Sequence, residues 1–303
     1  MDTDVSISRA AVSPAEDTRR RPVIAGIDGS RAAIRAAEWA ATEAMSRQAP
    51  LRLIATVPAI DKPAFRPGGN RYRYAQEALD TARRAVLARY PDDNPVEIAV
   101  EVRRGRPERI LVDLSHSAAL IALGATDIGF FAHLVLGSTA LSVTRDARCP
   151  VALVRPAAAA RGDVLVVVTD RHSAKPALSA AFQAAHERGA DLVVARIWPG
   201  RPWTGIEEWG RAPALVTDAQ IRHCQRDFPD VGFRPVTVVG DVLSAVERFS
   251  STAQLVVVTR DGESVAPTRL GRTTQDLVCH ASCPVLVLPD GPAPDVNSEA
   301  VNR

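Results

Sequence analysis

The chain has 303 residues, is 46% hydrophobic and carries a formal net charge of +2 at pH 7. Acidic and basic residues are interspersed, and no basic stripe with interleaved aromatic residues occurs, so we expect no nucleic-acid partner. The sequence contains no apolar run long enough to cross a bilayer and no export signal near its first residue, so we expect a cytoplasmic protein with no membrane partner. Its length favours two domains, because a single hydrophobic core rarely grows beyond about 250–300 residues.

Short Val-, Ile- and Leu-rich runs alternate with helical segments along the first half of the chain. The runs predict strands at 22–28, 51–57, 96–102, 119–124 and 150–155. Helices are predicted at 31–47, 71–90, 107–116 and 138–147. Ala37, Ala40, Ala41 and Ala44 recur at helical spacing and predict a small-residue face laid against a sheet. Strands that are apolar on both faces and alternate with helices indicate a parallel sheet covered on both sides.

The chain is an internal repeat, because the second half echoes the first at four places. The paired segments are 21–30 with 163–173, 51–57 with 191–198, 96–107 with 233–242, and 148–156 with 282–290. We therefore predict two tandem α/β domains of the doubly wound, Rossmann type, each with a five-stranded parallel sheet. Their predicted limits are residues 21–156 and 163–289, with a linker at 157–162 and disordered tails at 1–20 and 290–303.

Two stretches fit neither a strand nor a helix. Residues 58–70 and 199–213 contain Pro, Gly and aromatic residues, and each follows the second strand of its half. Long loops of this kind serve either as lids over a ligand or as surface insertions packed on their own aromatic residues. Both interpretations remain open at this point.

The four cysteines, Cys149, Cys224, Cys279 and Cys283, are too few for a disulfide framework and favour a reducing compartment. Cys279 and Cys283 flank His280, which is compatible with a metal site, but Cys283 begins a predicted buried strand, as Cys149 does. We therefore predict core cysteines rather than metal ligands.

The segment 120–154 holds the residues best suited to bind an anion. A predicted strand ends at Gly124, Asp127 and Gly129 follow in a turn, and Gly137 and Ser138 precede a predicted helix. Backbone amides at such a helix start point the same way and carry no countercharge, and glycine lets a phosphate approach the chain. Gly-Ser before a helix is also an ordinary helix start, so the pattern gains weight from its spacing.

The spacing Gly124-x2-Asp127-x9-Gly137-Ser138 resembles the nucleotide loop of the universal stress protein family, G-x2-G-x9-G-[S/T]. The resemblance covers nearly the whole chain outside the tails and implies an ATP-binding regulator of the bacterial stress or dormancy response. It implies that Asp28, beside Gly29, contacts adenine and that the backbone at Thr56 reads the adenine edge. It further implies phosphate and ribose contacts from Gly124, Gly137, Ser138 and Thr139, with Asp127 and Gly129 in the same nucleotide-binding loop. A lone Asp after a strand is otherwise a common turn residue.

Asp127 departs from the family pattern, which has a glycine at this position. A carboxylate would repel triphosphate oxygens at contact range unless a divalent cation lay between them. Two outcomes are open: ATP bridged by Mg²⁺ near Asp127, or a weakened site. Asp tolerates the left-handed conformation that glycine supplies, and Gly129 gives the loop slack.

The second half keeps fewer of these residues. Aligning Cys283 on Cys149 places Gly271 on Gly137, Arg272 on Ser138 and Val258 on Gly124. A branched side chain would crowd a phosphate, so we expect this half to be mainly structural and to bind nucleotide weakly if at all. The candidates for this weaker site are Asp170, Ile197, Gly271, Arg272 and Thr273.

Enzymatic activity is not indicated beyond slow ATP hydrolysis. The sequence contains no P-loop, no G-x-G-x-x-G motif and no Ser-His-Asp relay. Two rivals to a nucleotide-gated regulator remain: a nucleotide-free interaction module, and a slow ATPase in which Asp28 and Asp127 hold Mg²⁺. No general base is positioned by the sequence for the second.

The resemblance also implies how the two halves meet. In the family the last strand commonly pairs domains, so residues 151–154 and 285–288 are expected to form the interface between the halves. The chain would then carry its own pseudo-dimer, with a homodimer of chains as a further possibility.

Overall fold

A computed structural model describes residues 21–59, 69–90, 96–125, 137–156, 161–168, 174–198, 218–239, 242–260 and 270–289. The predicted tails and most of the predicted linker and of the loops 58–70 and 199–213 lie outside these ranges. Within them, every strand and helix predicted for the first half is present, with bounds that agree within two residues.

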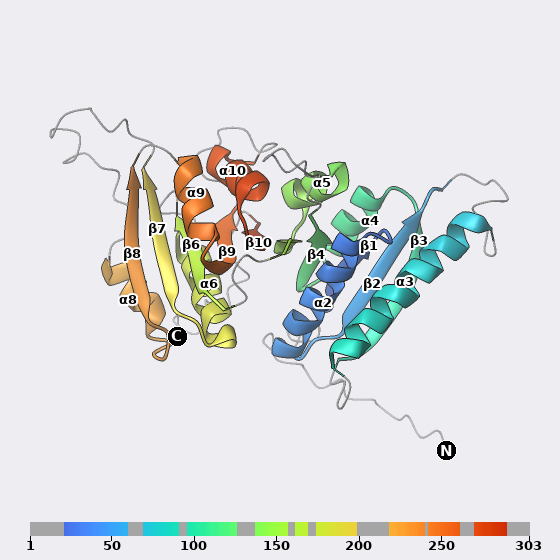
Figure 1. Cartoon of the computed structure of the whole chain (residues 1–303), viewed down its shortest axis with the longest axis horizontal. Coiled ribbons are helices and arrows are strands. Elements are labelled where there is room, and N and C mark those ends of the chain that lie inside the picture. The colour runs from blue at the N-terminus through green and yellow to red at the C-terminus, as the bar shows by residue number, and fades with distance from the viewer. Residues whose placement is uncertain are drawn as a thin grey trace, which may run out of the picture.

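Ten strands in the described residues form one sheet, in the order β3-β2-β1-β4-β5-β10-β9-β6-β7-β8 (Figure 1). All neighbours within each half are parallel. The first half contributes β1 (Val23–Ile27), β2 (Leu51–Val57), β3 (Ile98–Arg104), β4 (Leu120–Gly124) and β5 (Val151–Val154). The second contributes β6 (Asp163–Val168), β7 (Leu192–Trp198), β8 (Phe233–Val239), β9 (Ala253–Thr259) and β10 (Val285–Leu288).

The two halves meet where β5 and β10 pair antiparallel. Leu153 lies opposite Val285, and Val151 lies opposite Val287. This confirms the predicted contact between the last strands. It also refines the prediction of two five-stranded sheets, because the pairing joins them edge to edge into one continuous sheet.

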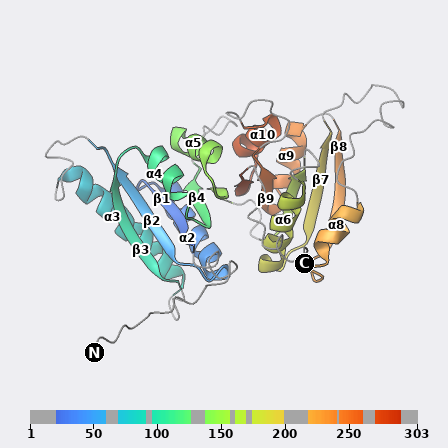
Figure 2. The ribbon, with the colours of Figure 1, turned by 180° about the vertical axis from the view of Figure 1, so that it is seen from behind.

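In the described residues, four helices cover each face of this sheet (Figures 1 and 2). On one face lie α2 (Arg31–Ser46), α3 (Asn70–Arg89), α6 (Ala174–Arg188) and α8 (Asp218–Gln225). On the other lie α4 (Pro107–Leu114), α5 (Ser138–Asp146), α9 (Val242–Ser250) and α10 (Arg272–His280). The predicted alanine face of α2 is fully buried against the sheet. Each hydrophobic core runs through both halves, so apolar burial helps to hold the halves together.

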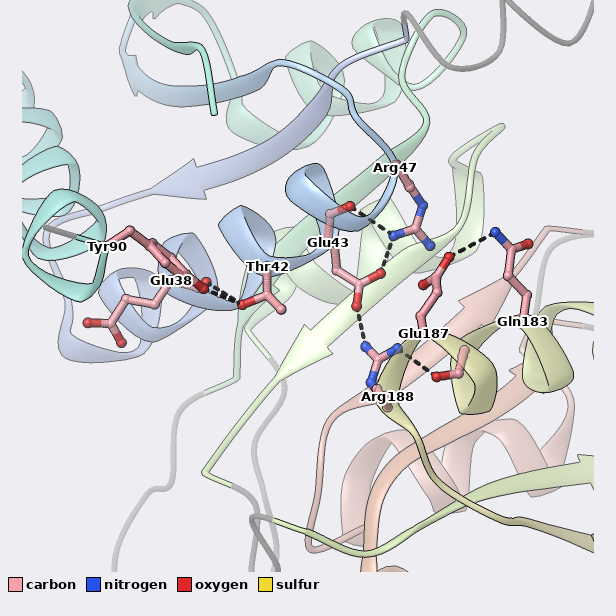
Figure 3. A network of polar contacts seen from close by, with 9 residues as sticks. Glu38, Thr42, Glu43, Arg47, Tyr90, Gln183, Glu187 and Arg188 are labelled. Atoms are coloured by element: carbon pink, nitrogen blue, oxygen red, sulfur yellow. Dashed lines mark hydrogen bonds and ion pairs between the residues drawn. The ribbon is translucent and has the colours of Figure 1, made fainter. Parts of the chain in front are cut away.

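A buried ion-pair cluster also joins the halves. Glu43, near the end of α2, is 3% exposed and pairs with Arg47 on the same helix and with Arg188 at the end of α6 (Figure 3). Burial by itself raises the pKa of the Glu43 carboxyl, but the charges and hydrogen bonds of the two guanidinium groups outweigh this, and the pKa lies below its ordinary value. The carboxylate therefore stays charged inside the junction.

None of the helices described here is both long and apolar enough to cross a membrane.

Candidate functional site

A cavity of about 420 Å³ opens in the first half at the carboxyl ends of β1, β2 and β4. β1 and β4 are neighbours in the sheet, and their connections leave toward opposite faces, which is where open α/β sheets hold ligands. Its volume lies within the range of about 300–1,000 Å³ that is usual for small-molecule sites. Six sequence-predicted residues line it: Asp28, Thr56, Gly124, Gly137, Ser138 and Thr139.

The turn after β1 presents Asp28 to this cavity. The Asp28 Oδ1 accepts a hydrogen bond of 2.9 Å from the Ser30 N–H, and the Ser30 Oγ accepts one of 3.1 Å from the Ala33 N–H. Ser30 is therefore the N-cap residue of α2. Gly29 has φ +86°, a left-handed conformation that favours glycine, and lies beside the cavity rather than in its lining.

Gly124 is required by packing as well as by its place in the cavity. A Cβ there would lie 2.4 Å from the backbone carbon of Ala32 and 2.7 Å from the Ala33 nitrogen. Because β4 passes this close to the first turn of α2, no side chain fits between them. The absence of a side chain thus brings the end of β4 and the start of α2 together on the cavity wall.

The start of α5 is open. Gly137 is the N-cap residue and is exposed, and among the described residues no atom beyond its chain neighbours lies within 4 Å of the position a Cβ would take. Ser138 and Thr139 begin the helix and line the cavity with it. The first-turn amides of a helix lack intrahelical acceptors and carry a partial positive charge, so this end of α5 suits an anionic group.

The cavity wall formed by α3 and α4 was not predicted from the sequence. Tyr74 is 61% exposed, and its hydroxyl lies 2.8 Å from where a Cβ on Gly29 would stand. Arg71 adds a cation to the same wall. The missed residues are Arg71, Tyr74, Ala75 and Ala78 from α3, with Pro107 and Leu111 from α4. The α3 residues recur at i, i+3, i+4 and i+7, so their shared helix face was a signal available in the sequence.

Asp127 and Gly129 lie outside the described residues, so the predicted Mg²⁺ site near Asp127 stays a prediction. Within the described ranges, no cluster of three or more His, Cys, Asp or Glu side chains suited to a metal ion occurs.

The strand register of the second half corrects the sequence alignment. Ile121 N–H donates to Pro150 O in the first half, and Val256 N–H donates to Pro284 O in the second. These equivalent bonds place Thr259, not Val258, on Gly124. The interval from 124 to 137 is 13 residues and that from 259 to 271 is 12, so alignment through the helix and the cysteine without a gap is wrong by one.

The equivalent corner of the second half, between the end of β9 and the start of α10, is closed by packing of the described residues. Thr259 is 5% exposed, and its carbonyl accepts a 2.8 Å hydrogen bond from the buried Thr274 hydroxyl. Gly271, the counterpart of Gly137, is buried, and its N–H donates to Arg260 O at 3.2 Å. The N–H of the glycine at the start of α10 is therefore already used within the second half.

The other second-site candidates lie apart from these contacts or outside the description. Thr273 is half-buried in the first turn of α10, and Arg272 begins that helix. Ile197 lies in β7. Asp170 lies outside the described residues.

The cysteines at the strand starts are core residues. Cys149 and Cys283 are free thiols, and burial raises the pKa of each to about 12. Both thiols therefore stay protonated at neutral pH, in agreement with the sequence prediction.

Fold and cavity together define a duplicated, doubly wound α/β protein with a ligand-sized crevice at the switch point of its first half. The universal stress protein family model matches residues 19–155 and 161–289, and the chain belongs to that family.

Its relatives agree. The chain is 30% identical over 268 residues to universal stress protein Rv2028c of Mycobacterium tuberculosis, covering 88% of this chain and 95% of that protein. It is 32% identical over 278 residues to universal stress protein Rv2624c of the same species, covering 88% and 96%. The crystal structure of a universal stress protein from Archaeoglobus fulgidus shares the fold, with a TM-score of 0.66, 16% identity and coverage of 89% and 99%.

Proposed function

We propose that the first half binds one adenine nucleotide, ATP in the first instance, and that the chain acts as a regulator in a stress response through its nucleotide-bound and nucleotide-free states. The observation that carries this proposal is the single cavity that Asp28, Thr56, Gly124 and the open start of α5 line together. Membership of the universal stress protein family supports the regulatory part of the proposal.

The chemistry at the two ends of the cavity suits the two ends of the ligand. At the β1–β2 end, the Asp28 carboxylate would accept from the exocyclic amine of adenine, and the backbone of Thr56 would read the base edge. At the α5 end, the amides of Ser138 and Thr139 would donate to phosphate oxygens. Arg71 on the α3 wall would offset part of the phosphate charge.

Regulation then follows from differential affinity. A nucleotide shifts a conformational equilibrium only if it binds one state more tightly than the other. The ligand would contact α2, α3 and α5 at once. Nucleotide binding therefore favours the state in which these three helices are close enough for all of them to contact it.

Titration calorimetry of the full chain with ATP, with and without Mg²⁺, tests the proposal. We expect one site per chain, because in the second half the helix-start residue Gly271 is buried and hydrogen-bonded, and Thr259 occupies the place of Gly124. Binding only with Mg²⁺ would support a metal bridge at Asp127, and equal binding in both conditions would argue against it. An absence of heat in both conditions would overturn nucleotide binding and favour a nucleotide-free interaction module.

Gly137→Val gives the matching variant. The added Cβ would have no atom of the described residues within 4 Å beyond its chain neighbours, and φ is −59° at this residue, so the fold should tolerate the change while the side chain fills the phosphate position. Leu141→Gln, one turn further along α5 and 43% exposed, is the control and should bind as the unmodified chain does. Unchanged binding by Gly137→Val would show that the ligand sits elsewhere.

A further inference from the structure

The two ends of helix α5 lie against different halves of the chain. Its first residues line the cavity of the first half. At its far end, Arg260 of the second half donates from Nη1 to Arg145 O at 2.6 Å and to Ala147 O at 3.0 Å. A nine-residue helix is only about 14 Å long, so the guanidinium lies one short helix away from the crevice.

These contacts are of a kind that fixes a short helix. The last carbonyls of a helix have no intrahelical donor and carry a partial negative charge, so a guanidinium there satisfies both needs. The neighbouring Asp146 lies within the field of the same group: its pKa is lowered mainly by its bond to Arg145, with a smaller contribution from the charge of Arg260. α5 has only nine residues, so its end contacts weigh heavily in its position.

The second half has a reciprocal contact. Arg155, which follows β5, donates to Val278 O at 2.6 Å and to Ala281 O at 2.5 Å at the end of α10. Each half thus caps the last turn of the other half's equivalent helix. Only α5 begins at the open crevice, because Gly271 at the start of α10 is buried and hydrogen-bonded.

We propose that Arg260 is a positioning residue for the nucleotide site. Although the equivalent corner of the second half is itself closed, Arg260 from that half fixes the position of α5 and thereby the placement of the phosphate-facing amides at its start. The inference rests on the proposed function of the first half. The second half then has a role beyond pairing its last strand with β5, because it holds the helix that carries the phosphate-facing amides.

The test compares Arg260→Met, Arg260→Lys and Arg155→Met in the full chain by ATP titration. Met keeps the aliphatic stem and removes the donors, and we expect affinity to fall on the order of fivefold, a usual coupling between sites. Both bonds come from one nitrogen, Nη1, so a lysine ammonium should restore most of the affinity. Arg155→Met removes the matching contact at α10 and should leave affinity unchanged.

Hydrogen exchange supplies a readout that is independent of ligand. Amides of α5 should exchange faster in Arg260→Met, and those of α10 should not, while Arg155→Met should show the converse. An unmodified chain that binds no nucleotide would overturn the proposed function and this inference together. A chain that binds, with Arg260→Met binding equally well or with Arg155→Met weakening binding as much, would overturn the inference alone.

Discussion

The two halves share one fold but differ at the corner where a ligand would sit. In the first half Gly124 ends the strand and Gly137 stands open at the helix start. In the second half, buried Thr259 takes the place of Gly124, and the N–H of buried Gly271 donates a hydrogen bond to the carbonyl of Arg260. The comparison teaches that duplicating the scaffold does not duplicate the site, because access to a few main-chain amides depends on one side chain and one internal hydrogen bond.

The halves also differ at the junction. Gln48 and Gly189 have left-handed φ values of 52° and 57°, which aligns the end of α2 with that of α6. Glu43 therefore corresponds to Ala184, and Arg47 to Arg188. Both arginines converge on the single carboxylate, and a second carboxylate beside it would add like-charge repulsion in a buried place.

The largest expected effect comes from removing that carboxylate. Glu43→Ala should lower the free energy of unfolding by about 3–5 kcal/mol, because two partly buried guanidinium groups lose their partner. Adding Ala184→Glu to this variant should recover much of the loss, since the new carboxylate would stand at the equivalent place on α6. Denaturant unfolding of the three proteins measures this, and a double variant no better than the single one would refute the equivalence of the two positions.

The proton-linked part of that effect is smaller. The folded-state pKa of Glu43 lies below the ordinary value of 4.5, so its contribution to stability is present above pH 4.5 and is lost as pH falls through the folded pKa. The unmodified chain should therefore lose more stability below pH 4.5 than Glu43→Gln does. Parallel slopes for the two proteins in acid unfolding would contradict the assignment.

Gly124→Thr would give the first half the residue of the second. Its Cβ would meet the backbone of Ala32 and Ala33, so we expect a destabilisation of about 1–3 kcal/mol, as for overpacked cores. ATP binding should be lost at the same time. Thr259→Ser is the matched change in the second half and should leave ATP affinity as it was, which titration of both variants checks.

The smallest effect is expected inside the closed corner. Thr274→Val keeps the shape of the side chain and removes the hydroxyl that donates to Thr259 O. The loss of one buried hydrogen bond should cost about 1–2 kcal/mol. The stoichiometry of ATP should stay at one per chain, and a second equivalent bound by Thr274→Val would show that this bond is what keeps the corner shut.

Local patterns in the sequence predicted most of the fold. Alternating apolar runs and the alanine spacing of α2 depend on neighbours along the chain, so strands, helices and the repeat were accessible. The predicted site residues from Asp28 to Thr139 that are described do meet at one cavity, apart from Gly29 at its side, because parallel strands end at the same edge.

Features that depend on contacts between residues far apart in the chain could not be predicted from the sequence. Glu43 gives no local sign that Arg188 will reach it across the junction, and Arg260 meets Ala147 from 113 positions away. The register of Thr259 was missed because the loop before α10 is one residue shorter than its counterpart. The shared helix face of Tyr74 and Arg71 can be seen in the sequence, but only the packing of α3 against the sheet shows that this face lines the cavity.

The antiparallel joint between β5 and β10 has a further consequence. The last strands of the two halves pair with each other, so the edge strands of the described sheet are β3 and β8. Glu101 and Arg103 in β3 and Pro235 in β8 discourage the addition of further strands. Because the two partners share one polypeptide, their association does not weaken on dilution as that of separate chains would. A cell holding few copies of this protein would still hold every one of them fully paired.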